Sequence, residues 1–594
     1  MIEQKIAQAV ADAVMQNYGK EILPSAIQIQ KTNPEFVGDL TVVIFPLLGI
    51  SRKSPEITGN QIGKFLLSSI SEISSFQVVK GFLNLCLTDE FFIEVLKSTE
   101  DICHFGFTQP GNEAPVVVEF SSPNTNKPLH LGHIRNNLLG NAVSQILKAS
   151  GKNVVKVNLV NDRGIHICKS MLAWKLWGNG ETPESSGIKG DHLVGKYYVL
   201  FDKKFKEEVK SYVIQGMPEE EAEKRSTLMQ QARQLLVKWE NHDSETIALW
   251  KSMNAWVYEG FDVTYRRMGI SFDKTYHESE TYLLGKKIVE KGLGEGLLVR
   301  NKDGSVWADL TSEGLDEKLL LRSDGTSVYI TQDLGTAHLR YGEYYPQQLI
   351  YVVGNEQNYH FDVLKAVLKK LGYSWSEKLH HLNYGMVELP HGKMKSREGT
   401  VVDADDLMDT MTDTARKTTE ALGKAEEASP EDLELLYQKV GMAALKYFIL
   451  KVDPKKNMLF NPEESIDFNG NTGPFIQYTH ARIRSLLRKA GADNNPEQIA
   501  YTGIQLHKNE KAVLDALRNF PEIVQQAADM LSPALIANYI FDLAKTYNAF
   551  YQEVPVMKEE NAVLKHFRLH LSFFTASVIK NGMSLLGIDV PEKM

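Results

Sequence analysis

The middle of the chain alternates short apolar runs, rich in β-branched residues, with longer amphipathic runs. Buried strands are predicted at Val116–Val118, Asn153–Val160 and Gln348–Val353, and the run from Ile134 to Leu147 predicts a helix after the first strand. Strands that alternate with helices form a parallel sheet with ligands at the carboxyl ends of its strands. We therefore predict a Rossmann-like, doubly wound α/β domain over residues 112 to about 435.

A mixed pattern of helices and strands precedes this domain. Residues 1–111 are predicted to form a separate α+β domain, which the turn-forming Gln109-Pro-Gly-Asn112 separates from the first central strand. The predicted elements are a helix within Met1–Lys20, a strand at Leu40–Ile44, a helix at Gly59–Ser69, and strands at Gln77–Lys80 and Phe82–Leu87.

Helical periodicity dominates two further stretches. Residues 183 to about 260 are rich in Lys, Glu and other helix formers, and we interpret them as helices inserted into the sheet domain, with solvated charged faces. Residues 436–594 are predicted to form an all-α helical bundle. Its predicted helices are Gly441–Leu450, His480–Ala490, Asn509–Phe520, Ser532–Gln552 and Asn561–Gly587.

Composition and charge narrow the classes of function. The 594 residues carry a net charge of −9, which argues against a general nucleic-acid coat protein but allows a specific RNA partner on a local basic surface. Cys86, Cys103 and Cys168 form no CxxC pair, so no zinc framework or disulfide scaffold is expected and a reducing cytosol fits. No apolar run approaches the ~18 residues of a membrane span. The first helix contains Glu3 and Asp12, unlike a signal peptide.

The loop between the first central strand and its helix has the arrangement of a phosphate site. Free backbone N–H groups and the dipole of the helix would point at this loop, and His130-Leu-Gly-His133 marks the start of the helix. The loop contains neither GxxxxGK[ST] nor GxGxxG, so it is neither a P-loop nor a dinucleotide fingerprint. Each imidazole can donate a hydrogen bond to a phosphate oxygen, and Gly132 leaves room for a flat ring.

The string Glu-Phe-Ser-Ser-Pro-Asn-x-x-Lys-Pro-x-His-x-Gly-His, from Glu119 to His133, resembles the HIGH signature of class I aminoacyl-tRNA synthetases, in the form found in arginyl-tRNA synthetases. The bare HxGH pattern is weakly specific, whereas the whole string is highly specific. The resemblance implies an arginine–tRNA ligase that uses ATP with Mg²⁺ and needs neither zinc nor an organic cofactor. It also implies a cytoplasmic protein, which we expect to be a monomer. Its partners would be L-arginine, ATP and the tRNA for arginine, with no membrane.

A second phosphate element is predicted at His391–Thr400, which resembles the KMSKS loop. Lys393 and Met394 agree with that pattern, but Ser396 stands where the family has its second lysine, and Lys395 comes one residue early. Many arginyl enzymes share this loss and carry a lysine before the HIGH signature. We therefore assign Lys127 as the main substitute cation, with Lys393 and Lys395 as helpers. The alternative is that Lys127 is an ordinary loop lysine.

The chemistry of amino-acid activation requires little acid–base catalysis. The attacking carboxylate is already ionised at pH 7, so catalysis consists of positioning and of neutralising charge on the phosphates. Catalytic roles are therefore assigned to His130, His133 and the lysines named above. The resemblance implies ATP contacts from Pro123, His130, Gly132, His133, Asn136, His360, Met386, Val387, Met394 and Ser396.

Carboxylates placed for a guanidinium would select arginine. Glu119 adjoins an apolar strand, where a charge is costly unless it meets a partner, and the planar fork of arginine is such a partner. By resemblance, Asn124 holds the amino-acid head, Glu119 and Asp333 take the charged ends, Tyr329 lines the pocket, and Ser121, His133 and Gln357 complete it. The plain alternative for Asp333, which is expected to follow a strand, is an N-cap for a helix that begins near Leu334.

RNA contacts are predicted in both flanking domains. In the N-terminal domain, Phe82 and Asn84 match positions that stack on and hydrogen-bond an unstacked base at the elbow of the tRNA, the alternative being Phe82 in the core and Asn84 in a turn. In the helical domain, which resembles an anticodon-binding domain, the candidates are Gln477, Tyr478, Arg482, Arg484 and Tyr547, beside His480. Of Tyr547 and Tyr551, one turn apart, one is expected in the core and one on an RNA face, and Tyr547 is assigned to the RNA.

Three other hypotheses fit parts of the chain. A synthetase for another amino acid, such as cysteine, shares the chemistry, but the chain lacks a Cys/His zinc cluster. A nucleotidylyltransferase would use HxGH without tRNA, against which the length and the C-terminal domain argue. An inactive relative that binds tRNA or senses arginine is favoured only by Ser396.

Overall fold

The computed structural model describes residues 2–33, 35–388, 402–421, 429–492, 501 and 503–594. The chain divides into two compact units. One is formed by residues 1–105, 486–520 and 545–578, and the other by residues 106–485, 521–544 and 579–594. Within the described ranges, no helix is long and apolar enough to cross a membrane.

The larger unit is built on a five-stranded sheet in the order β12-β11-β5-β6-β7, with all neighbouring strands parallel. Its strands are β5 (Val116–Glu119), β6 (Val154–Val160), β7 (Lys274–His277), β11 (Gln348–Gly354) and β12 (Leu379–Tyr384). The prediction of a doubly wound parallel sheet is confirmed, and the three predicted strands match β5, β6 and β11 to within a residue or two.

The strand order fixes where a ligand can bind. From β5 the chain proceeds through β6 to one edge of the sheet, and it later returns to β11 on the other side of β5. In such sheets the ligand crevice lies at the carboxyl ends of the two strands where the order reverses. Here those ends are Glu119 of β5 and Gly354 of β11, and helices α5 (Leu131–Ala149) and α15 (Asn358–Lys370) follow them.

Helix α5 packs directly on the central strands because glycine permits it. A Cβ atom at Gly140 would lie 2.2 Å from Cγ of Phe120, which is fully buried just after β5. Larger residues at position 140 would push the helix away from the sheet. The close packing holds the start of α5 against the crevice.

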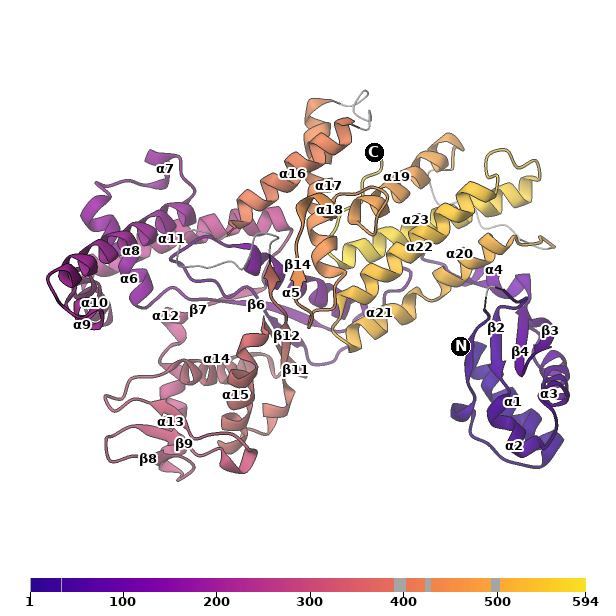
Figure 1. The fold of residues 1–594 in the computed structure, drawn as a ribbon, viewed down its shortest axis with the longest axis horizontal. Coiled ribbons are helices and arrows are strands. Elements are labelled where there is room, and N and C mark those ends of the chain that lie inside the picture. Colours follow the sequence, from indigo (N-terminus) through magenta and orange to yellow (C-terminus); the bar gives the residue numbers. More distant parts are fainter. Residues whose placement is uncertain (1, 34, 389–401, 422–428, 493–500, 502) are drawn as a thin grey trace. The chain divides into compact units, whose positions relative to one another are not determined.

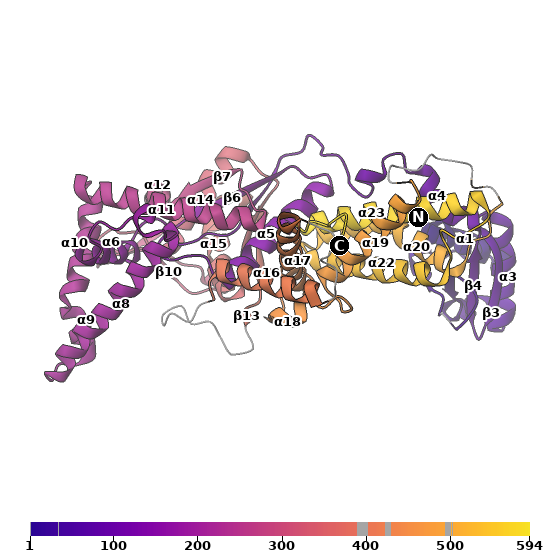
Figure 2. The ribbon, with the colours of Figure 1, turned by 90° about the horizontal axis from the view of Figure 1, so that it is seen from above.

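Helices fill the connection between β6 and β7, as predicted. They are α6 (Ile165–Trp177), α7 (Pro183–Ser186), α8 (Gly190–Ile214), α9 (Glu219–Arg225), α10 (Thr227–Glu240) and α11 (Ser244–Met268). Helices α8 and α11 lie side by side (Figures 1 and 2). A second insertion, between β7 and β11, was not predicted. It contains α12 (Glu278–Thr281), α13 (Leu284–Gly294), α14 (Tyr329–Tyr344) and an antiparallel sheet of β8 (Val299–Arg300), β9 (Val306–Ala308) and β10 (Lys318–Leu321).

The rest of the larger unit is mostly helical. After the sheet, β13 (Val387–Glu388) pairs in parallel with β14 (Met458–Leu459), and α16 (Ala404–Ala421) packs on α17 (Pro430–Leu450). The helices that follow are α18 (Pro462–Ser465), α19 (Gly473–Lys489), α20 (Lys508–Arg518), α21 (Phe520–Asp529), α22 (Pro533–Glu553) and α23 (Ala562–Leu585). Of these, α20 and most of α23 belong to the smaller unit, and α19 and α22 each end in it. The predicted bundle helices are therefore confirmed, although the first begins at Pro430.

The smaller unit contains an antiparallel sheet in the order β1-β2-β4-β3. Its strands are β1 (Ile29–Lys31), β2 (Leu40–Val43), β3 (Ile73–Val79) and β4 (Phe82–Leu87), and its main helices besides α20 are α1 (Ile2–Tyr18), α3 (Pro55–Ser69) and α4 (Asp89–Ser98). Lys80 and Gly81, both with positive φ, form the two-residue turn between β3 and β4. The predicted α+β fold of this segment is confirmed, while the domain boundaries at 111 and 435 stay predictions.

Candidate active site

The imidazoles of His130 and His133 lie together at the start of α5, with ring centroids 3.9 Å apart. His130 is the N-cap, and its Nδ1 accepts the backbone N–H of Gly132 at 3.1 Å, while Nδ1 of His133 accepts the backbone N–H of His130 at 3.2 Å. Because each Nδ1 is an acceptor, each neutral ring carries its proton on Nε2. The helix cap therefore leaves two Nε2–H groups as donors for a ligand.

Both imidazoles are neutral at pH 7. Burial lowers the pKa of His130 to about 4, helped by the charge of Lys127. Burial also lowers the pKa of His133 well below 6.5, with smaller contributions from His130 and Lys127. These rings can hydrogen-bond a phosphate, but its negative charge must be balanced by another group.

The backbone N–H groups at the start of α5 are largely occupied within the chain, which corrects the prediction that they are free. Those of His130 and Gly132 donate to the imidazoles, and that of Leu131 donates to the carbonyl of Val402 at 3.1 Å. The donors that remain for a phosphate at this point are thus the imidazole Nε2–H groups.

Lys127 lies in the loop that leads into α5. Burial lowers the pKa of its ammonium, and no carboxylate in the described part of the chain contributes to that pKa. Helix α8 passes close to this loop, as Gly195 shows: a Cβ atom there would lie only 2.9 Å from Cδ of Pro128. A cation without a carboxylate partner, beside two neutral imidazoles, is placed to balance a phosphate charge. The alternative of an ordinary loop lysine stays open.

The second predicted phosphate element lies outside the described residues, including Lys393, Met394, Lys395 and Ser396. The segment that precedes it is attached to α5 by Arg135, which is fully buried. The guanidinium of Arg135 donates to the carbonyls of Met386 at 2.9 Å, Pro454 at 3.1 Å and Lys456 at 2.8 Å. Since the backbone N–H of Met386 also donates to Asn457, both polar backbone groups of Met386 are occupied.

The predicted nucleotide contacts at Met386 and Val387 differ in exposure. The side chain of Met386 is exposed, whereas that of Val387 is buried within the pairing of β13 with β14. A contact with a nucleotide through the Met386 side chain stays a prediction, and the structure offers no exposed side chain at Val387.

The segment after the undescribed loop returns to the first histidine. Val402 accepts the backbone N–H of Leu131, and the backbone N–H of Ala404 donates to the carbonyl of Leu129 at 3.0 Å. His130 and Asp403 thus form an antiparallel bridge. The described flanks of the two predicted phosphate elements therefore meet at the same end of α5.

Two serines after β5 have left-handed backbones. Ser121 has φ of 78° and Ser122 has φ of 46°, conformations that side chains disfavour. Their backbone N–H groups donate to Oδ1 of Asn136 at 2.6 Å and to Oδ1 of Asn158 at 3.0 Å. These bonds turn the chain sharply away from the sheet and hold it there.

Two predicted ligand contacts are occupied by this scaffold. Besides accepting from Ser121, Asn136 donates through Nδ2 to the carbonyl of Val352 and to the hydroxyl of Tyr384. The assignment of Asn136 to ATP is therefore wrong, because its buried amide holds β5, β11 and β12 together. The hydroxyl of Ser121 is bonded to Tyr265 and Asn137, so it is not open to arginine either. Pro123 is also buried, and its carbonyl accepts from the N–H of Asn161.

Glu119 has a partner within the chain. Its carboxylate pairs with Arg340 of α14, whose side chain is 1% exposed, and it also accepts the hydroxyl of Ser122 at 3.0 Å. The Arg340 guanidinium lies over the rings of Tyr276 and Tyr351. We expected this buried carboxylate to need a guanidinium, and Arg340 of the protein itself provides it. The structure therefore corrects the assignment of Glu119 as the acceptor for substrate arginine.

Asp333 lies within α14, which begins at Tyr329. It neither follows a strand nor caps a helix at Leu334, so both of those expectations are wrong. Its carboxylate contacts Nε2 of His360 on α15 at 2.6 Å and remains partly exposed. The structure thus brings together one residue predicted for the arginine pocket and one predicted near the adenosine.

The remaining predicted arginine contacts are open to solvent. Tyr329 is 80% exposed, so it does not line a closed pocket here. Gln357, in the turn after β11, and Asn124, in the loop after β5, are exposed as well. They occupy the two carboxyl ends that border the crevice, and their contacts with arginine stay predictions.

Glu278 is a candidate that the sequence analysis missed. Burial raises its pKa to about 7; the charge of Arg163 opposes this shift, and the charges of Asp162 and Asp333 add to it. Asp162 has hydrogen bonds from Ser279 and Tyr258, whereas Glu278 has no ion-pair partner among the described residues. The sequence carried only a weak signal for Glu278, which directly follows β7 at the carboxyl edge of the sheet, because this strand has only four residues.

Comparisons with known proteins identify the family to which the chain belongs. Residues 103–461 match the family model described as tRNA synthetases class I (R), catalytic domain, and residues 476–594 match the DALR anticodon binding domain. Curated arginine–tRNA ligases from Parabacteroides distasonis and Bacteroides thetaiotaomicron are each 56% identical to the chain, with 100% of both chains covered. The solved structure of Thermus thermophilus arginyl-tRNA synthetase is 26% identical, with a TM-score of 0.77 over 100% of both chains.

The chain belongs to the arginyl-tRNA synthetases.

The residues that this arginyl-tRNA synthetase was predicted to use at the tRNA elbow adjoin one cavity. The cavity, of about 290 Å³, is lined by Phe82, Asn84, Thr41 and Phe36 among others. Phe82 is 37% exposed, and Asn84 is paired within β4, so the alternative of a core Phe82 and a turn Asn84 is wrong. The Thr41 hydroxyl donates to Oδ1 of Asn84 at 2.7 Å. The RNA contact itself stays a prediction.

The helical part of the synthetase requires two corrections. Gln477 is fully buried and donates to the carbonyls of Lys439 and Asp589, and Tyr547 is fully buried and donates to Ser572. Neither can contact RNA from these positions, and Tyr551 is the exposed member of its pair. His480 is also buried and donates to the carbonyl of Pro591.

The other predicted RNA residues of α19 are only partly buried. Arg482 lies over the ring of Tyr478, 4.8 Å from its centroid, and Nε of Arg484 donates to Glu592 at 2.6 Å. Gln477 and His480 are one turn apart on the stripe that faces the core, which explains why their neighbours are the accessible residues. Contacts of Tyr478, Arg482 and Arg484 with tRNA stay predictions.

The pairing of Glu119 with Arg340 can be tested by stability. We expect Arg340→Met to lower the free energy of unfolding of the synthetase by about 3–5 kcal/mol, because it leaves a buried carboxylate unpaired. The more exposed pair Lys196–Glu181 provides the control, since Lys196→Met should lower the free energy of unfolding much less. Urea unfolding followed by tryptophan fluorescence measures both. Equal midpoints for the two variants would contradict the role given to Arg340.

Proposed function

We propose that this chain activates L-arginine with ATP, forming arginyl-adenylate and pyrophosphate, and then transfers arginine to the 3′-terminal adenosine of its tRNA. The observation that carries the proposal is the pair of neutral imidazoles beside Lys127, at the crevice of the sheet whose edge also presents Asp333 and Glu278. The identity of 56% with curated arginine–tRNA ligases over the full chain supports the same reaction.

In the first step, an oxygen of the arginine carboxylate bonds to the α-phosphorus of ATP, and the bond to the pyrophosphate oxygen breaks. The carboxylate is already ionised, so no side chain has to remove a proton. The Nε2–H groups of His130 and His133 donate to phosphate oxygens, and Lys127 balances the negative charge that grows there. Mg²⁺ enters bound to ATP, as part of the substrate.

Arginine is selected by two carboxylates that form no ion pair with a guanidinium among the described residues. Glu278 and Asp333 accept the planar fork, and Asn124 and Gln357 hold the amino-acid end. Lysine offers a point charge, so it leaves acceptors in such a site unpaired, which gives roughly 10⁴-fold discrimination without an editing domain. His360, bonded to Asp333, lies between the arginine site and the adenosine.

The flanking segments bind the tRNA. Residues 1–111 contact its elbow, where Phe82 stacks on an unstacked base and Asn84 donates to it from the floor of the cavity. Residues 436–594 contact the anticodon arm through Tyr478, Arg482 and Arg484. All of these residues belong to a single chain, and we propose that the enzyme acts as a cytoplasmic monomer.

The proposed function is tested by ATP–pyrophosphate exchange. We expect exchange to require arginine, ATP and tRNA together, and His130→Ala and His133→Ala each to slow it on the order of 10²-fold, as for the loss of one donor from a preorganised anion site. His166→Ala, at an exposed histidine that contacts the hydroxyl of Tyr198, serves as the control. Unchanged single-turnover adenylate formation in both variants would refute the role of the imidazoles.

Lys127 has its own test. Replacing it with methionine removes the charge but keeps much of the volume, and we expect activation to slow on the order of 10²-fold. Lys152→Met, which changes an exposed lysine beyond the helix, should leave the rate unaltered. If single-turnover rates of Lys127→Met and the wild type agree, Lys127 is an ordinary loop residue.

Glu278 makes arginine binding depend on pH. Only its ionised form accepts a guanidinium, and its pKa of about 7 in the free enzyme means that bound arginine holds it ionised and releases a proton. The affinity for arginine is therefore full above this pKa and falls below it. We expect binding to weaken about tenfold from about pH 8 to about pH 6, as measured by calorimetry.

The matched variants separate Glu278 from its neighbour. Glu278→Gln should bind arginine weakly at every pH and lose most of this dependence. Glu280→Gln, two residues along and exposed, should retain it. A Glu278→Gln profile that parallels the wild type would assign the effect to another group.

A further inference from the structure

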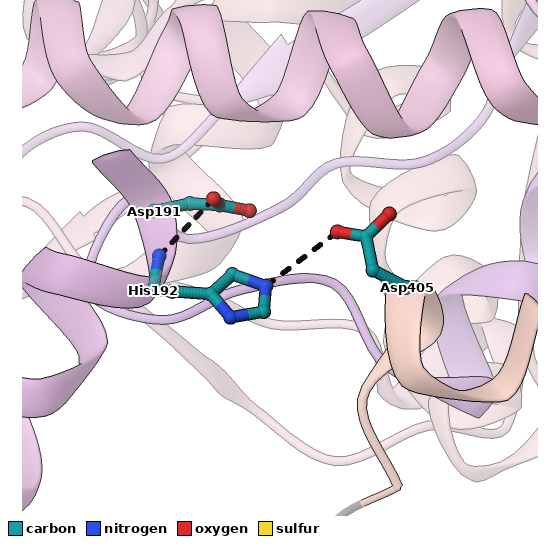
Figure 3. Close-up of side chains that lie close together, drawn as sticks. All are labelled: Asp191, His192 and Asp405. Atoms are coloured by element: carbon teal, nitrogen blue, oxygen red, sulfur yellow. Dashed lines mark hydrogen bonds and ion pairs between the residues drawn. The ribbon is translucent and has the colours of Figure 1, made fainter. Parts of the chain in front are cut away.

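A cluster of charged side chains joins the starts of α8 and α16 to the C-terminal part of α11. Figure 3 shows three of its members, Asp191 and His192 at the start of α8 and Asp405 at the start of α16. Asp405 receives Nζ of Lys189 at 2.6 Å, the hydroxyl of Thr264 at 3.1 Å and a guanidinium nitrogen of Arg267 at 3.1 Å. One carboxylate thus connects both long helices of the insertion to the helix that follows the second phosphate element.

The cluster is already neutralised by the chain. Asp191, His192 and Asp405 are close enough to hold a metal ion, but Nζ of Lys189 lies 3.1 Å from Asp191 and 2.6 Å from Asp405. An ammonium in that place supplies the positive charge that a metal would supply. The cluster is therefore a junction between helices, and its effect on the enzyme depends on the segment to which α16 is connected.

His192 bridges the junction to Asp403. Its Nε2 lies 3.4 Å from Oδ2 of Asp403 and 3.5 Å from Oδ2 of Asp405. The other oxygen of Asp403 accepts the backbone N–H groups of Asp405 at 2.8 Å and Asp406 at 3.2 Å, which caps the start of α16. One carboxylate therefore links the insertion, through His192, to the first turn of α16.

The backbone at Asp403 is the segment that holds His130. Asp403 and His130 form an antiparallel bridge, closed on one side by the bond from Leu131 to Val402 and on the other by the bond from Ala404 to Leu129. A displacement of this segment would move the N-cap of α5 and, with it, the imidazole that we assign to the phosphate. Asp403, which belongs to the junction, is thus paired through its backbone with His130, the proposed catalytic donor.

The sequence of α11 is adapted to this junction. A Cβ at Gly260 would lie 2.4 Å from Oδ1 of Asp191, which is fully buried, so glycine is needed for the helices to approach. One turn along, Thr264 receives Lys189 and donates to Asp405, and Arg267 follows three residues later. These residues lie on one face of α11, directed at α8 and α16.

We propose that Asp403 and Asp405, held by Lys189, His192 and Arg267, are positioning residues that fix the imidazole of His130 in its catalytic position. The proposal rests on the proposed function, because it takes His130 to contact ATP. A misplacement of a reacting group by about 1 Å is enough to cost on the order of 10²-fold in rate. The helical insertion therefore acts on the reaction through the backbone of residues 402–404.

The test measures kcat and KM for ATP–pyrophosphate exchange with the full-length enzyme and tRNA. Asp405→Asn removes the charge that Lys189 and Arg267 share, and Asp403→Asn removes the charge opposite His192 while keeping an N-cap, since Asn caps helices as well as Asp does. We expect kcat to fall at least about tenfold for Asp405→Asn and less for Asp403→Asn, with KM for ATP within about twofold. Asp406→Asn, exposed in the same turn, is the matched control and should not change kcat.

A double-mutant cycle with His130 distinguishes positioning from a general loss of structure. In the His130→Ala background, Asp405→Asn should lower kcat by less than about twofold further, because there is no longer an imidazole to place. Independent, multiplicative losses would overturn the proposal, as would a wild-type kcat in both Asp403→Asn and Asp405→Asn. If Asp405→Asn does not fold, the same cycle with Asp403→Asn decides. A wild-type kcat in His130→Ala alone would instead refute the proposed function of that residue.

Discussion

The reciprocal hydrogen bonds at the start of α5 determine what the centre of this enzyme can do. Each imidazole accepts a backbone N–H through Nδ1, so the interactions that cap the helix also fix the tautomer of both rings. The backbone donors that usually bind anions at a helix N-terminus are used up by this arrangement. The hydrogen bonds that begin the helix therefore also determine that Nε2–H is the donor left for a ligand.

A consequence is that the positive charge must come from outside the pair. Burial keeps both imidazoles neutral, and neutral donors bind a phosphate without the cost of desolvating a buried cation. Lys127 lies three residues before His130, and no carboxylate among the described residues contributes to the pKa of its ammonium. This loop lysine before the histidines is therefore the cation that we propose balances the charge of the phosphate.

Other buried charges in the sheet domain are paired or hydrogen-bonded within the chain. Carboxylates that are not paired in this way are the candidates for binding a charged substrate. Arg340 neutralises Glu119 under the crevice, and Arg135 is bonded to three carbonyls. Asp162 has several hydrogen bonds. Glu278 differs from these groups, because burial raises its pKa, it has no ion-pair partner among the described residues, and the charge of Asp333 adds to the shift. A flat guanidinium that donates hydrogen bonds to both carboxylates would satisfy that need.

Much of the fold could be predicted because its signals are local. Apolar runs such as Val116–Val118 and the helical pattern after His133 reflect burial directly, and both were placed correctly. Strands of two to four residues, such as β8 to β10, are too short to show a period, so the second insertion was missed. Roles that depend on a distant partner could not be derived: Glu119 was assigned to the substrate because nothing in the sequence places Arg340 beside it. Gln477 and Tyr547 failed for a related reason, since an amphipathic helix shows which residues share a face but not which face is buried.

The position of the second insertion also explains why the pocket was only half recognised. Glu278 and Asp333 lie 55 positions apart and belong to the start of α12 and the second turn of α14, on either side of a small sheet that the sequence did not reveal. Asp333 was found through its motif, whereas Glu278 follows a short strand, β7, whose four residues show no clear alternation. The rule that ligands bind at the carboxyl ends of parallel strands applies equally to both positions. To predict Glu278 from the sheet rather than from a motif, β7 would have had to be recognised first. This strand lies at the edge of the five-stranded sheet, next to β6, and its hydrophobic pattern is weak for that reason.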